Sequence, residues 1–147
     1  MTPVTKVFDA FLQKITEDEW GYWTEEEVHE DLLAILTSAR PWFKFPKVDL
    51  EITTDELSGE TVLVGDLNYM EIQILSTYMK CEWLNRCLMS WENVKPLYEE
   101  RDFSQANLID KFRAMLEKEK TNALKLEQIY YRSIQSKPFD YNQMTLN

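Results

Sequence analysis

The chain has 147 residues, of which 44% are apolar, and its 26 acidic and 16 basic side chains give a formal net charge of −10. A load of 5 Trp, 7 Tyr and 7 Phe excludes intrinsic disorder, and the length suits one domain that buries roughly two thirds of its unfolded surface. Three glycines are too few for a sheet-rich fold or a glycine-lined phosphate loop. The negative charge argues against a broad nucleic-acid footprint, because phosphate binding depends on Lys and Arg.

The negative charge is confined to the first half of the chain. Residues 1–74 hold 5 basic and 16 acidic side chains, whereas residues 75–147 hold 11 and 10. Two interpretations stay open. The first half is either an ordinary solvated acidic surface, or it faces a basic partner or DNA that it must not hold.

Two helices are predicted before residue 41. For the first, we expect Thr2 as N-cap and Pro3 at the first helical position. For the second, Thr24 and Glu27 form a capping box, and Pro41 marks the end. Apolar residues follow a helical period in both segments and predict their buried faces: Val4, Val7, Phe8, Phe11, Leu12 and Ile15, then Val28, Leu32, Ile35, Leu36 and Ala39.

The segment from Pro41 to Asp66 does not have a helical pattern. Apolar and acidic residues alternate from Val48 to Ile52, and Thr61–Val64 is a short β-prone run beyond a Ser-Gly turn signal. A small β-hairpin or a long ordered loop is expected here. Before it lie three aromatic rings within four residues, which either plug the helical core or form an exposed interface anchor: Trp42, Phe43 and Phe45.

Two longer helices are predicted in the second half. Asn68 caps the first of them with Glu71 at the capping-box position, and its apolar residues leave little polar surface, which is typical of a helix central to a core or between subunits. It ends near Val94-Lys95-Pro96. The last helix follows Asp102-Phe103-Ser104 and runs to about Ser133, long enough to suggest a partner beyond a compact domain.

We therefore predict a mainly α fold, a small bundle of about four helices in a single domain over residues 1–136. Residues 137–147 have no periodicity and are expected to form a C-terminal arm. Its spaced apolar residues either fray or dock on a neighbour as an extended segment: Phe139, Tyr141, Met144 and Leu146. Together with Trp42, Phe43 and Phe45, they are the candidate partner-binding residues.

No catalytic or cofactor signature is present, so we expect neither enzyme activity nor a cofactor. The single histidine, His29, is interpreted as a surface residue without a nucleophile motif beside it. Cys81 and Cys87 lie six residues apart in one predicted helix, about 240° around its axis, so they cannot pair there. A zinc site needs about four Cys or His ligands, and we expect no metal. Neither a signal peptide nor a membrane span is found.

One acidic pattern has the spacing of a calcium loop. Its carboxylates and threonine occupy positions 1, 3, 5, 7 and 12 of an EF-hand: Asp49, Glu51, Thr53, Asp55 and Glu60. The sixth position, which needs glycine for its sharp turn, is Thr54. Because such spacing arises easily in acidic chains, we do not expect calcium binding.

The order of elements resembles a known family. A short helix over Val4–Leu12 precedes the capped Thr24–Leu33 helix and an aromatic-proline loop, and a hydrophobic helix over Glu71–Trp91 then leads to the long charged helix. The most specific pieces are Glu82-Trp83-Leu84 and Asp102-Phe-Ser-Gln-Ala-Asn107. Over about residues 4–132 this resembles small tailed-phage neck proteins of the head-to-tail connector or adaptor type.

The resemblance implies a helical virion component without enzyme activity. Such a protein is made in the host cytoplasm and forms a ring, often twelvefold, beneath the portal, where it extends the DNA channel and meets tail or neck proteins. An acidic lining would repel the DNA backbone, so that the genome passes without specific binding. The middle segment Val48–Val64 is longer than this family pattern.

Two other interpretations remain. An acidic monomeric regulatory or inhibitory protein, which occupies a basic surface of a partner, explains the charge equally well. A small metal-dependent enzyme is the third, and it lacks a convincing site in the sequence.

Overall fold

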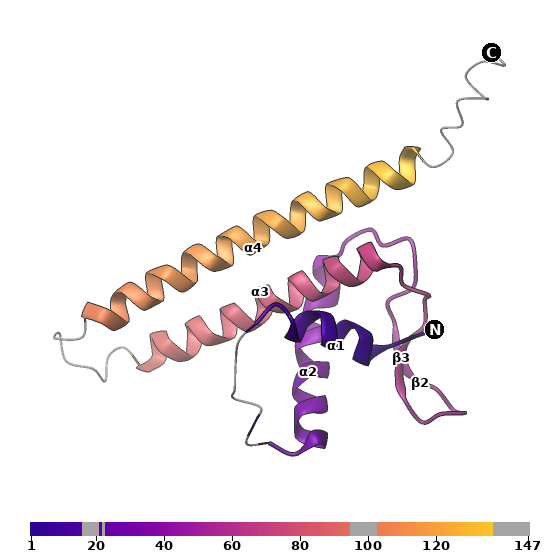
Figure 1. Cartoon of the computed structure of the whole chain (residues 1–147), viewed down its shortest axis with the longest axis horizontal. Helices are drawn as coiled ribbons and strands as arrows, with labels where there is room; N and C mark the ends of the chain where they lie inside the picture. Colours follow the sequence, from indigo (N-terminus) through magenta and orange to yellow (C-terminus); the bar gives the residue numbers. More distant parts are fainter. Residues whose placement is uncertain (16–20, 22, 95–102, 137–147) are drawn as a thin grey trace, which may run out of the picture.

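The computed structural model describes residues 1–15, 21, 23–94 and 103–136 of the chain. Four α-helices dominate it (Figure 1): α1 (Val4–Leu12), α2 (Glu25–Ala39), α3 (Tyr69–Val94) and α4 (Phe103–Ser136). A 3₁₀ turn, η2 (Arg40–Trp42), follows α2 directly, and three short strands complete the described fold: β1 (Thr2–Pro3), β2 (Ile52–Thr54) and β3 (Thr61–Leu63). The mainly α prediction is confirmed, and the middle segment contains a short hairpin.

Helix α3 is the centre of the molecule. It packs against α1, α2 and α4, and in Figure 1 α4 runs antiparallel along one side of it while α1 and α2 lie on the other. Its fully buried side chains include Ile74, Leu75 and Met79. The apolar surface almost all around α3 is thus explained by neighbours within its own chain.

Helix α4 contacts α3 through a seven-residue repeat. Ile109, Leu116, Ala123 and Tyr130 are all buried and follow one another at intervals of seven. This spacing keeps one seam of a long helix facing its partner, as in a coiled coil. With 34 residues, α4 is about 51 Å long at 1.5 Å per residue.

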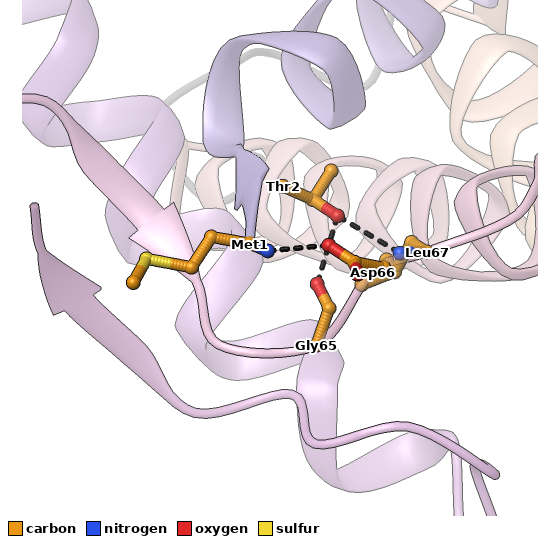
Figure 2. A network of polar contacts seen from close by, with 5 residues as sticks. All are labelled: Met1, Thr2, Gly65, Asp66 and Leu67. Atoms are coloured by element: carbon orange, nitrogen blue, oxygen red, sulfur yellow. Dashed lines mark hydrogen bonds and ion pairs between the residues drawn. The ribbon is translucent and has the colours of Figure 1, made fainter.

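Thr2 and Pro3 form a strand rather than a helix start. Thr2 and Pro3 pair antiparallel with Leu63 and Val62, so the sheet order is β1-β3-β2. The Thr2 Oγ1 donates to the Gly65 carbonyl oxygen and accepts from the Leu67 N–H, each at 2.8 Å (Figure 2). The prediction of Thr2 as N-cap is therefore wrong, because its hydroxyl is engaged across the sheet and α1 has no side-chain cap.

Helix α1 is shorter than its apolar stripe. It ends at Leu12, whose side chain is 38% exposed, and Ile15 packs against the core from outside the helix. The amino group of Met1 pairs with the Asp66 carboxylate, which adds a polar contact between β1 and the segment after β3 (Figure 2).

Both predicted caps of the following helices are present. Thr24 Oγ1 accepts from Glu27 N–H at 3.2 Å at the start of α2. At the start of α3, the Asn68 N–H donates to Glu71 Oε1 and the Glu71 N–H donates to Asn68 Oδ1, each at 2.8 Å. The capping box at Asn68 is thus confirmed in both directions.

Candidate functional site

The aromatic segment after α2 divides between the core and the surface. Phe43 is 3% exposed and packs edge-on against Tyr130 of α4, with ring centroids 5.3 Å apart. Its neighbours point outward: Trp42 is 50% exposed and Phe45 is 72% exposed. Of the three predicted partner-binding aromatics here, two lie on the surface, and Phe43 fills the core.

The exposed aromatic rings rest on α3 and α4. Trp42 stacks on Tyr78 at a centroid distance of 6.4 Å, and its indole N–H donates to Glu82 Oε1 at 2.6 Å. Phe45 meets the ring of Tyr131 at 6.2 Å. Both rings are therefore supported from beneath and presented in a defined orientation, which lowers the entropy lost when they bind a partner.

A buried hydrogen-bond chain fixes the same segment from inside. The Lys47 N–H donates to the Tyr130 hydroxyl at 2.8 Å, and that hydroxyl donates to Glu71 Oε2 at 2.7 Å. Glu71 is 2% exposed and uses its other oxygen for the α3 capping box. Burial, together with this bond to Glu71, raises the pKa of Tyr130 to about 12, so the hydroxyl stays protonated and keeps donating.

Basic residues are the sequence neighbours of the exposed rings. Residues 40–47 contain Arg40, Lys44 and Lys47 and no acidic residue, although residues 1–74 as a whole have more than three acids for every base. The side chains of Lys44 and Lys47 are exposed. We call Trp42, Lys44, Phe45 and Lys47 the aromatic-basic surface.

A small cavity opens beside Trp42. It measures about 100 Å³ and is lined by apolar and polar side chains: Trp42, Tyr78, Cys81, Glu82, Asn85 and Lys120. At roughly 30 Å³ of liquid per water, this is room for about three waters or for one branched aliphatic side chain.

The tip of the β2–β3 hairpin has the opposite charge. Residues 55–60, which we call the acidic tip, contain three acidic residues and no base. Its leucine, Leu57, is 98% exposed. In Figure 1 the hairpin extends away from α3 and α4, the helices against which the aromatic-basic surface is built.

The tip has a defined conformation. Asp55 accepts from the Leu57 N–H at 3.1 Å and from the Ser58 hydroxyl at 3.0 Å, and the Gly59 N–H donates to the Asp55 carbonyl at 2.7 Å. Gly59 has φ +72°, a conformation open to glycine without steric cost. The carboxylate of Asp55 is thus used within the turn. Among the described residues, no group of three His, Cys, Asp or Glu side chains is placed to hold a metal ion.

His29 lies in an open groove between α1 and α2. The groove measures about 350 Å³, and His29 is half-buried there, edge-on to Phe8 at 5.6 Å and 3.4 Å from Thr61 Oγ1. Apolar side chains of both helices make up much of its lining: Phe8, Leu12, Trp23, Val28 and Leu32.

Both cysteines of the chain lie on α3, and neither forms a disulfide. Cys81 is buried, and that burial raises its pKa to about 11, while Cys87 is half-buried. A thiol with a raised pKa is a poor nucleophile at neutral pH. The predicted arm residues Phe139, Tyr141, Met144 and Leu146 lie outside the described residues.

Sequence reasoning did not single out Leu57 or the lysines of the aromatic-basic surface. A leucine within an acidic turn was a usable signal, because an apolar side chain at a hairpin tip has no neighbours to pack against and stays exposed. The run of bases from Arg40 to Lys47 inside an acidic half was the second signal.

Comparison of the chain with protein-family models, curated proteins and solved structures finds no match. No helix among the described residues combines the length and apolar character that a membrane crossing requires.

Proposed function

We propose that this protein is a structural virion component, a head-to-tail connector of a tailed phage that forms a ring beneath the portal and extends the DNA channel. The observation that carries the proposal is the presence of two complementary exposed surfaces, the aromatic-basic surface and the acidic tip, on different sides of one chain. When two different patches on a chain complement one another, each copy binds the next in a head-to-tail (heterologous) contact. Such contacts give a closed ring when the rotation from one copy to the next divides a full turn evenly.

The exposed acids of the first half support the channel role. Glu25, Glu26, Glu27 and Glu30 of α2 are all exposed. A ring lined with such groups repels the phosphate backbone, so that DNA slides through without being held. The long α4 supplies the extended surface for portal or tail proteins.

Gene position tests this function. We expect the gene to lie between the portal or capsid genes and the tail-tube genes, and electron microscopy of the concentrated protein to show rings. Duplex DNA of mixed sequence is expected not to bind in a gel-shift assay at physiological salt. A gene among early functions, or tight binding of duplex DNA, would contradict the connector role.

The same acidic surface favours one alternative, a monomeric regulatory protein that occupies a basic surface. The exposed acids of α2 are the residues that such a partner would contact. Affinity capture from host lysate, with the charge reversal Glu26→Lys/Glu30→Lys as matched control, tests it. Capture of a basic protein by the wild type and not by the variant would favour the regulator, and no difference between them would exclude it.

A further inference from the structure

We propose that the acidic tip of one copy docks on the aromatic-basic surface of the next, with Leu57 entering the cavity beside Trp42. The proposal names the contact by which copies of the chain associate, and it rests on the proposed ring only for its biological setting.

Exposure and size support the apolar part of this contact. Leu57 is 98% exposed on a turn whose backbone is fixed by Asp55, so it is presented to solvent as a rigid apolar knob. The cavity beside Trp42 measures about 100 Å³ and has an aromatic wall of Trp42 and Tyr78. A leucine side chain suits a site of that size, and its entry releases water from apolar surface on both partners.

The charges around the knob and the cavity are complementary. Glu56 and Glu60 flank Leu57 in the sequence, and both are exposed. Lys44 and Lys47 are exposed and are sequence neighbours of Trp42 and Phe45, and Lys120 lines the cavity itself. The one carboxylate in the lining, Glu82, accepts from the Trp42 indole N–H. Opposite charges steer the two surfaces together and fix the orientation of docking.

We assign the occupant as a second copy because both complementary surfaces belong to the same sequence and lie apart within one chain. The aromatic-basic surface is held against α3 and α4 by Tyr78 and Tyr131, while the hairpin extends away from both helices (Figure 1). Only one hairpin turn and one shallow surface meet, which is a small interface of the weak, transient class. Association is therefore expected at high chain concentration, and ring closure adds the effect of several linked contacts.

Two charge-reversal variants test the contact. The tip variant is Glu56→Lys/Glu60→Lys, and the surface variant is Lys44→Glu/Lys47→Glu. In each variant the acidic tip and the aromatic-basic surface then have charges of the same sign. Sedimentation equilibrium up to about 1 mM chain should show association of the wild type, at a concentration scale where weak interfaces form. Each variant alone should associate at least about tenfold more weakly, and an equimolar mixture of the two should recover association.

Controls separate this contact from general charge and folding effects. Glu26→Lys/Glu30→Lys changes the net charge as much as the tip variant and should leave association as in the wild type. Leu57→Ser should weaken it without any change of charge, and circular dichroism with thermal unfolding should show that every variant folds. A wild type that stays monomeric at about 1 mM, or a mixture that fails to recover association, overturns the proposal.

The result is independent of the connector role. If the variants behave as expected and the gene lies among early functions, the contact stands and the proposed function fails. If rings form beneath a portal and neither variant affects them, the proposed function stands and this contact is wrong.

Discussion

At the scale of single residues, one buried carboxylate joins three segments of the chain. Glu71 caps its own helix through Asn68 and accepts a hydrogen bond from Tyr130 of α4, whose hydroxyl in turn accepts from the backbone of Lys47. A buried carboxylate is costly unless it is hydrogen-bonded, and here both of its oxygens have donors. The position of the aromatic-basic surface therefore depends on a residue that is itself hidden.

Replacement of Tyr130 by Phe should destabilise the protein by about 1–3 kcal/mol, because the Lys47 N–H and Glu71 Oε2 each lose the hydroxyl as partner. Urea unfolding followed by fluorescence measures the change. Tyr69→Phe is the matched control, since Tyr69 is 77% exposed, and it should be nearly neutral. Equal effects of the two substitutions would show that the buried network adds nothing to stability.

At the scale of elements, helices were predictable where the signal is local. The capping residues Thr24 and Asn68 and the apolar periods define α2 and α3 within a few neighbouring positions, and both caps are present. Strand β1 was not predictable, because Thr2-Pro3 has the pattern of a helix start and only its pairing with β3 shows otherwise.

The candidate site was predictable only in part, for a similar reason. Three aromatic rings in four residues predict that the segment either fills the core or binds a partner. No local pattern shows which ring is buried and which is exposed. That choice depends on Tyr78, Tyr130 and Tyr131, which come from helices much later in the chain.

The junction between β3 and α3 has room for glycine only. A Cβ on Gly65 would lie 2.6 Å from the Asp49 carbonyl oxygen and 2.8 Å from Val48 Cβ. Gly65→Ala should therefore destabilise the protein by about 1–3 kcal/mol through backbone displacement. Gly21→Ala is the control, because nothing lies within 4 Å of its added Cβ. Thermal unfolding of both variants measures the difference, and a Gly65→Ala variant as stable as Gly21→Ala would disprove the close packing.

At the scale of the whole molecule, opposite charges occupy separate surfaces of one chain. The net charge of −10 is concentrated in residues 1–74, yet three of the five bases in that half lie between Arg40 and Lys47. Net charge alone therefore describes solubility, whereas the separation of charge is the feature on which the proposed contact between copies depends.

Stability should fall in alkaline solution. Burial raises the pKa of Cys81 to about 11 and that of Tyr130 to about 12, so folding favours the neutral form of both groups. Their contribution is complete below the ordinary pKa values of 9.0 and 10.0 and is lost as the pH rises through the raised values. Urea unfolding from pH 8 to pH 12 measures this loss. The Tyr130→Phe variant should lose less stability above pH 10 than the wild type, and parallel curves would refute the role of Tyr130.

The pairing of β1 with β3 also orders the events of folding. Thr2 bonds to Gly65, 63 residues along the chain, so this closure encloses α1 and α2 in a single loop. Contacts of such long range form slowly, because the chain loses the entropy of closing the loop before the contacts stabilise it. Helices α3 and α4 are neighbours in the sequence and are expected to meet early. The β2–β3 hairpin that carries the acidic tip is itself local, so β1 is the strand expected to join the sheet last.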